Sequence, residues 1–248
     1  MVSRLTAIFI YLICLLILIE LNGIIPPMLN SFLNIGIVVI TIIFIKYIRY
    51  ITTTIESHIK ELDELIINQN YQDAIQLAER LAKKEEYAVH FGLQKSIAYA
   101  CMGDFERFYK NYEEISTHSQ HRGYLYNCLE VLKCSVDLLH EKINSINIHI
   151  NIKKNEEKEL LKYGYGTLYQ VIKALSQKDY STAINPALTM TETAQKKYFK
   201  FFYCYVLILC YYNLQDTEKA KSYLKNIENL AYTDFLRGKF EEIKEILK

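Results

Sequence analysis

Two apolar stretches fill most of the first fifty residues, and they constrain the fold more than any other feature of the sequence. From Leu5 to Ile19 no residue is charged, and a second apolar run extends from Phe32 to Ile45. With its flanks, each run reaches about 17 to 20 residues, the length at which a helix crosses a bilayer. The segment therefore has to meet lipid or be buried by the rest of the chain.

A helix-breaking segment separates the two runs. It contains Gly23, Pro26 and Pro27, residues that stop helices and turn the chain. We therefore predict a transmembrane helical hairpin over residues 1–50, with spans at about 5–25 and 30–48. No A-x-A-like site follows the first run and a second span does, which argues against a cleaved signal peptide. Two buried core helices of a soluble protein are the alternative.

Basic residues predict the orientation of this hairpin. Arg4 precedes the first span, and Lys46 and Arg49 follow the second, whereas the loop between the spans has no Lys or Arg. By the positive-inside rule, both termini and the rest of the chain are expected in the cytoplasm, on a bacterial-type inner (plasma) membrane. Glu20 would then reach the outer headgroups; a functional carboxylate inside the membrane is the sharper alternative.

Cysteine usage agrees with a reducing compartment. The cysteines are at positions 14, 101, 128, 134, 204 and 210, and none forms a CxxC pair. Position 14 lies in the apolar leader, so five cysteines, an odd number, remain in apolar helical surroundings. We interpret them as small buried hydrophobic residues and not as a disulfide framework.

Beyond Tyr50 the chain reads as pairs of amphipathic helices. Apolar residues recur every three to four positions from Ile51 onward, and we expect this first helix to continue from the second span. Polar turns are predicted at 68–70, 103–104, 177–179, 214–216 and 237–239, each between two helices. The helices are expected over 51–66 and 71–81, 87–102 and 105–115, 164–176 and from 180, 199–213 and 217–230, and on both sides of the last turn, within 233–247.

The turns carry a recurrent motif: NYQDA at 70–74, GDFERF at 103–108, KDYSTA at 178–183, QDTEKA at 215–220 and GKFEEI at 238–243. This pattern resembles the tetratricopeptide repeat, in which a turn of the type G-D/N-Y/F-x-x-A opens the second helix. Ala74 and Phe108 are 34 residues apart, the period of that family. Phe108 and Ile243 replace the expected alanine, and Thr217 replaces the aromatic residue.

The resemblance covers residues 51–248 and implies an all-α fold, a two-helix transmembrane hairpin followed by an α-α superhelical solenoid. Ala74 and Ala78 would be close-packing positions. A generic α-α superhelix is the alternative. Phe108 and Ala183 are 75 residues apart, about two periods, so a degenerate helix pair is expected between them. Within it we predict a helix over 124–139, a second one ending near Asn151, and an exposed turn at KKNEEKE, residues 153–159.

Neither catalytic nor cofactor-binding motifs are found. The sequence has no phosphate-binding, dinucleotide-binding or zinc-protease motif. Lys and Arg number 29 and Asp and Glu 28, so the charge does not point to nucleic acid. His118, His121 and Cys128 could be drawn as metal ligands, but a solvated loop is the simpler interpretation. We therefore expect no enzyme, cofactor or metal.

The family resemblance places the first helix of each pair on a concave surface that binds peptides or helices. The predicted partner-binding residues are His90, Leu93, Ile97, Tyr165, Leu168, Ile172, Phe202, Tyr205, Leu209 and Tyr212. Aromatic anchors of this kind suit a protein or peptide partner. The alternative is that most of these side chains fill the core of the solenoid.

The hairpin, the repeated turn and the missing catalytic motifs together predict a membrane-anchored scaffold or adaptor that binds a protein or peptide partner. A membrane sensor or immunity-type protein, which responds to an external peptide or toxin through its outer loop, is the alternative. A membrane-bound enzyme with an unrecognised site is a third possibility. The sequence leaves the oligomeric state open.

Overall fold

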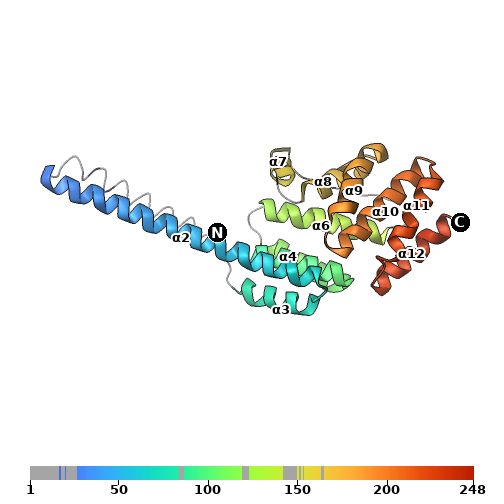
Figure 1. The fold of residues 1–248 in the computed structure, drawn as a ribbon, viewed down its shortest axis with the longest axis horizontal. Coiled ribbons are helices and arrows are strands. Elements are labelled where there is room, and N and C mark those ends of the chain that lie inside the picture. Colours follow the sequence, from blue (N-terminus) through green and yellow to red (C-terminus); the bar gives the residue numbers. More distant parts are fainter. Residues whose placement is uncertain are drawn as a thin grey trace. The chain divides into compact units, whose positions relative to one another are not determined.

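The computed structural model describes residues 17, 20, 27–83, 87–118, 123–141, 150, 152, 154–162 and 165–248. These residues are helical with short connections, which confirms the all-α class, and they contain no strand (Figure 1). The helices are α2 Pro27–Ile67, α3 Tyr71–Ala82, α4 Ala88–Met102, α5 Phe105–His118, α6 Tyr124–His140, α7 Lys154–Lys162, α8 Gly166–Ser176, α9 Tyr180–Thr193, α10 Lys197–Asn213, α11 Thr217–Glu228 and α12 Asp234–Ile246.

The chain divides into two compact units. The first, the N-terminal unit, contains the described residues up to Glu61 together with Tyr87. The second, the helical unit, consists of residues 62–83 and of the described residues from Ala88 to Lys248. The long helix α2 contributes to both, because the division falls between Glu61 and Leu62.

Helix α2 confirms that the second predicted span continues into the first amphipathic helix, since it runs without interruption from Pro27 to Ile67 (Figure 1). It also corrects the predicted loop, because residues 27–31 are already helical. A proline suits the first turn of a helix, where its fixed φ angle fits and its missing N–H is not needed. The first predicted span lies outside the described residues apart from Ile17 and Glu20, so the hairpin stays a prediction.

Four of the five predicted turns share one backbone geometry. In each, one residue adopts a left-handed conformation: Gln69 (φ 63°), Gly103 (φ 76°), Lys178 (φ 57°) and Gln215 (φ 63°). The N–H of the next residue donates to the carbonyl five positions earlier, as in the bonds from Asn70 to Leu65, Asp104 to Tyr99, Asp179 to Ala174 and Asp216 to Tyr211. This is the Schellman arrangement, which pairs the last carbonyls of a helix before the chain reverses.

The residue after each left-handed position starts the next helix. Asp104, Asp179 and Asp216 each accept a hydrogen bond from the backbone N–H three residues later. Such N-caps satisfy donors that a helix start leaves unpaired. Four residues after each cap, the side chain is buried in every case: Ala74, Phe108, Ala183 and Ala220. Ala78 is buried as well, as expected of a close-packing position. The predicted helix-turn-helix connections are therefore confirmed at these four turns.

Two local predictions are wrong. The fifth predicted turn, 237–239, lies inside α12, which continues through Gly238. A glycine lowers helix stability by only about 1 kcal/mol relative to alanine, and the buried stripe of Leu236, Phe240 and Ile243 outweighs it. The predicted exposed turn at 153–159 is also helical from Lys154, where α7 begins. Acidic residues in its first turn favour a helix start.

Helix α10 forms the centre of the helical unit, where it packs between α9 and α11 (Figure 1). Its buried residues are Tyr198, Phe201, Phe202, Tyr203, Cys204, Tyr205, Val206, Leu207, Ile208, Leu209 and Cys210. They point in all directions around the helix axis, so α10 is enclosed on every side. Helix α10 also contacts α4, which is far from it in the chain.

Candidate interaction surfaces

The structure places most of the predicted partner-binding residues in the core. The buried members of that set are Leu93, Ile97, Leu168, Ile172, Phe202, Tyr205 and Leu209. These seven side chains lie in the core, as in the alternative interpretation, so partner binding at these positions stays a prediction. The physical reason is visible in α10, where Phe202 is 0% exposed because α9 and α11 cover it.

The three remaining predicted residues are partly exposed. His90 lies in the first turn of α4, Tyr165 precedes α8, and Tyr212 lies in the last turn of α10. They come from three different helix pairs, and most of the residues predicted to connect them into one surface are buried. The predicted groove is therefore not the candidate surface that the structure favours.

Most of the exposed large apolar side chains of the described chain lie in the N-terminal part of α2. Its exposed apolar residues are Ile35, Val38, Val39, Ile40, Ile42, Ile43, Ile45, Tyr47 and Tyr50. Ile35 and Ile43 are each 61% exposed. Among the described residues, this is the one helix long and apolar enough to cross a membrane. A patch of this size in water would favour aggregation.

One polar side chain inside the apolar stretch of α2 is satisfied within the helix, and basic and tyrosine residues follow the stretch. Thr41, in the middle of the apolar stretch, donates its hydroxyl to the Ile37 carbonyl at 2.8 Å, so this donor is satisfied within the helix. Lys46, Tyr47, Arg49 and Tyr50 follow directly after the stretch. Basic and tyrosine side chains are enriched where a helix leaves the hydrocarbon for the headgroups. Residues 27–45 would span about 28 Å at 1.5 Å per residue, close to the hydrocarbon thickness.

A second candidate surface lies within the helical unit, where the segment around the start of α12 packs against helices from the first half of the chain. Tyr232 donates its hydroxyl to the carbonyl of Cys101, near the end of α4. Its ring stacks on Tyr71, the first residue of α3, with 6.5 Å between centroids. Thr233 lies against Gly103, so closely that a Cβ on that glycine would meet the threonine Oγ1 at 3.0 Å.

An aromatic cluster continues this contact. Phe235 of α12 lies 4.5 Å from Phe105 of α5 and 4.6 Å from His140 of α6, measured between ring centroids. Burial in this cluster lowers the pKa of His140, which Asp137 raises and Lys239 lowers further. The cluster therefore favours the neutral imidazole.

Lys239 completes the contact. Its ammonium donates to the Glu141 carbonyl at 2.7 Å and to Glu242 Oε2 at 2.9 Å, and its side chain is 4% exposed. Two buried atoms beside it, Tyr205 Oη and Glu242 Oε1, have no hydrogen-bond partner. An unpaired buried polar group costs about 1–3 kcal/mol. The fit of α12 is therefore incomplete at this end.

We call the receiving surface the α12 docking site. It consists of the side chains of Tyr71, Phe105 and His140, the backbone of Gly103, and the carbonyl oxygens of Cys101 and Glu141.

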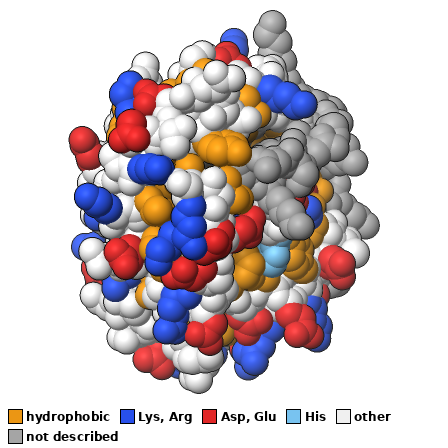
Figure 2. All heavy atoms as spheres, turned by 90° about the vertical axis from the view of Figure 1, so that its right-hand side faces the viewer, with side chains coloured by type: hydrophobic (Ala, Val, Ile, Leu, Met, Phe, Trp, Pro, Cys, Tyr) orange, Lys and Arg blue, Asp and Glu red, His pale blue; other side chains and the backbone are white. Residues whose placement is uncertain are grey.

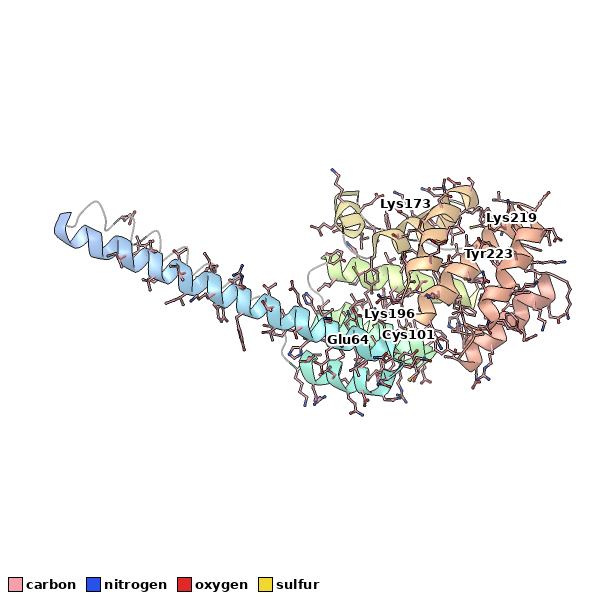
Figure 3. The ribbon with its side chains drawn as sticks, viewed as in Figure 1. Glu64, Cys101, Lys173, Lys196, Lys219 and Tyr223 are labelled. Carbon is pink, nitrogen blue, oxygen red and sulfur yellow. The ribbon has the colours of Figure 1, made fainter. Side chains whose placement is uncertain are left out.

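Two further contacts join the start of α10 to the end of α2 and to α6. Lys196, just before α10, pairs with Asp63 at 2.7 Å. Tyr198 and Ser135 share a hydrogen bond of 3.2 Å across 63 residues. Figure 3 shows Lys196 beside Cys101, where α10 meets α4. An ideal solenoid joins only neighbouring repeats, and these contacts depart from that rule.

Helices α5 and α6 are joined by a polar cluster on their shared side. Tyr109 donates its hydroxyl to Asp137 at 2.7 Å, and Lys133 donates to the same carboxylate at 2.6 Å. Tyr112 donates to Glu130. Burial, and then the hydrogen bonds to these carboxylates, raise the pKa of both tyrosines. The tyrosines therefore stay protonated and act as cross-links, not as acid-base groups.

The cysteines of the helical unit are free and buried, as the sequence predicts. Burial raises the pKa of the Cys101 and Cys128 thiols to about 12, which makes both poor nucleophiles. His118 ends α5, and His121 lies outside the described residues. In the part of the chain that the structure describes, no group of three potential ligand side chains could hold a metal ion.

Charge does not define a surface on the side of the molecule drawn in Figure 2. Lys and Arg side chains alternate there with Asp and Glu, and apolar side chains form only small patches (Figure 2). A mixed surface of this kind generates no strong field of one sign. On this side, recognition would have to come from shape and apolar anchors.

No protein-family model matches the chain, and neither a curated protein nor a solved structure is significantly similar to it.

The α12 docking site was not predicted from the sequence, because its residues show no distinctive local pattern. Tyr232 and Phe235 are ordinary aromatic residues at a helix start, and no local pattern indicates a contact 131 residues away. For α10 a signal existed: a helix that is apolar on all sides is expected to be buried.

Proposed function

We propose that the chain is a membrane-anchored adaptor, in which α2 holds the helical unit at a membrane and the helical unit binds a protein or peptide partner. The observation that carries the proposal is the exposed apolar surface of α2, which ends in Lys46, Tyr47, Arg49 and Tyr50. A bilayer would cover this surface. Helix α2 runs from the apolar stretch into the helical unit as one continuous helix.

The repeated turns support a tetratricopeptide-like architecture for the binding domain. Four turns with one geometry connect helices whose buried faces need neighbours. Surfaces of this type bind other polypeptides, and confinement to a membrane raises the local concentration of a partner that is itself at the membrane. We propose binding and localisation, not catalysis, as the role of this chain.

The proposal includes a cytoplasmic helical unit at the plasma membrane. Lys46 and Arg49 at the end of the apolar stretch support this orientation by the positive-inside rule. The five free, buried cysteines support a reducing compartment.

Alkaline carbonate extraction of bacterial membranes that contain the full chain tests the anchor. We expect the chain to stay in the membrane pellet. Ile43→Asp places a carboxylate in the apolar stretch, at about 3 kcal/mol by insertion scales, and should shift part of the chain to the soluble fraction. The matched control, Ile43→Leu, should behave as the wild type. Release of the wild-type chain by carbonate would refute the anchor.

Orientation needs an introduced thiol, because the native thiols of the helical unit are buried. Ser181 is exposed at the start of α9. In a Cys14→Ser background, Ser181→Cys should react with a membrane-impermeant maleimide only after the cells are opened. Labelling of this variant in intact cells would place the helical unit outside.

A further inference from the structure

The α12 docking site is assembled from four helix ends. Tyr71 begins α3, Cys101 lies one residue before the end of α4, Phe105 begins α5 and His140 ends α6. The segment that fills the site arrives from the opposite end of the chain, with sequence separations of 131 residues at Tyr232 and 98 residues at Lys239. Besides these side-chain contacts, the occupant packs against α11, its neighbour in the chain.

The occupant has a simple pattern. Tyr232, Phe235 and Lys239 are three and four residues apart, so they lie along one side of a helix and its N-terminal extension. Tyr232 and Lys239 each donate to a backbone carbonyl, and the Phe235 ring packs against two other rings. Grooves that bind amphipathic helices contact side chains with this spacing.

Two observations indicate that the present occupant fits the site imperfectly. Tyr205 Oη and Glu242 Oε1 are buried without a hydrogen-bond partner where Lys239 enters. Gly238 lies inside α12, at an exposed position where nothing approaches within 4 Å of an added Cβ, and it weakens the helix without a packing benefit. Local opening therefore removes fewer favourable contacts at α12 than at a fully enclosed helix such as α10.

We propose that the α12 docking site is the partner-binding surface of the helical unit, that α12 occupies it in the free protein, and that the partner is a helix with two aromatic residues three positions apart and a basic residue four positions further on. The partner displaces α12 and inserts its own anchors. This inference rests on the proposed adaptor function and specifies its partner.

Hydrogen exchange of the full chain in detergent micelles tests the opening of α12. Amides of α12 should exchange at least tenfold faster than those of α10, a difference of about 1.4 kcal/mol in opening free energy. Phe235→Ala should accelerate exchange in α12 a further tenfold and leave α10 unchanged. Equal exchange rates in α12 and α10 would show that α12 opens only on global unfolding and would overturn the proposal.

Binding in trans tests the site itself. The probe is a fluorescent peptide with the sequence of residues 230–248. It should bind the Phe235→Ala protein at least tenfold more tightly than the wild type, because the competing segment is weakened. A peptide carrying Tyr232→Ala and Phe235→Ala should not bind. Equal affinity for both proteins, or binding of the altered peptide, would overturn the proposal.

Two controls keep the outcome clear. If Phe235→Ala also deprotects α10, the comparison is made with Tyr232→Phe, which removes only the hydroxyl donated to the Cys101 carbonyl. If light scattering shows a dimer that depends on Phe235, a second copy fills the site and the proposed partner is wrong. Both experiments use micelles, so they fail or succeed independently of carbonate extraction, which tests the membrane anchor.

Discussion

The N-terminal part of α2 and helix α10 are both strongly apolar, the first mainly through isoleucine and the second mainly through aromatic residues, yet they occupy opposite surroundings. Ile43 of α2 is 61% exposed, whereas Ile208 of α10 is 0% exposed. Helix α10 packs between α9 and α11, which supply a protein environment. The apolar stretch of α2 stays uncovered among the described residues, and we assign its cover to lipid. Apolar sequence shows that a helix must leave water; it does not show what replaces the water.

Truncation of an apolar side chain should change the free energy of unfolding much more in α10 than in α2, and this is the largest expected difference between the two regions. Phe202→Ala in α10 should lower the free energy of unfolding of the helical unit by about 3–5 kcal/mol, because it leaves a cavity in an enclosed core. Ile43→Ala in α2 should change it by less than about 0.5 kcal/mol. Urea unfolding in micelles, followed by circular dichroism, measures both. Equal effects would mean that α2 is part of the same core.

Glycine substitutions should also affect the helical unit and the N-terminal part of α2 differently. Gly103 has a positive φ and touches Thr233, so Gly103→Ala should destabilise the helical unit by about 1–2 kcal/mol. Gly36 of α2 has nothing within 4 Å of an added Cβ, and Gly36→Ala should leave the unfolding midpoint unchanged.

The left-handed turn geometry also predicts that introducing a glycine, instead of removing one, stabilises the helical unit. Gln215 occupies the left-handed position of another turn, and Gln215→Gly should stabilise the unit by up to about 1 kcal/mol. A loss of stability in this variant would show that the glutamine side chain has a role the turn geometry does not explain.

The ion pair between Asp63 and Lys196 shows that the two ends of α2 have different surroundings. Its C-terminal end contacts protein through this pair, which is partly exposed, with side chains 36% and 18% accessible. A double-mutant cycle with Asp63→Asn and Lys196→Met should give a coupling energy of about 0.5–1 kcal/mol that falls with added salt. A coupling of zero at low salt would contradict the contact.

The smallest expected effect is a pH dependence confined to the helical unit. The folded-state pKa of His140 is lowered, so its contribution to stability is present above the unfolded pKa of about 6.5 and is lost as the pH falls through the folded value. The loss should be less than about 1 kcal/mol because the side chain is partly exposed. His140→Phe should flatten the profile between pH 7.5 and pH 5; an unchanged slope would assign it to other groups.

Sequence patterns predicted most of the helices and four of the turns because both depend on local chemistry. An aspartate cap and an apolar stripe every three to four residues act within one or two turns of helix. The prediction failed at Gly238, where long-range burial of the neighbouring side chains outweighs a local turn signal.

The candidate site was harder to predict. The family pattern placed Phe202 and Tyr205 on an open groove, although the absence of a polar side on α10 already indicated burial. Tyr232 and Phe235 could not be found, because their contacts depend on how the last helices return to the first ones. A single sequence contains no signal for that return.

The central claim is that lipid covers the apolar stretch of α2 and protein covers α10. Spin-label accessibility of the full chain in liposomes tests it most directly, with a label on Ile43→Cys and a reference label on Ser181→Cys, both in the Cys14→Ser background. Oxygen should relax the label at 43 strongly while a water-soluble nickel complex should not, and the reverse should hold at 181. Strong relaxation of the label at 43 by the nickel complex would contradict it.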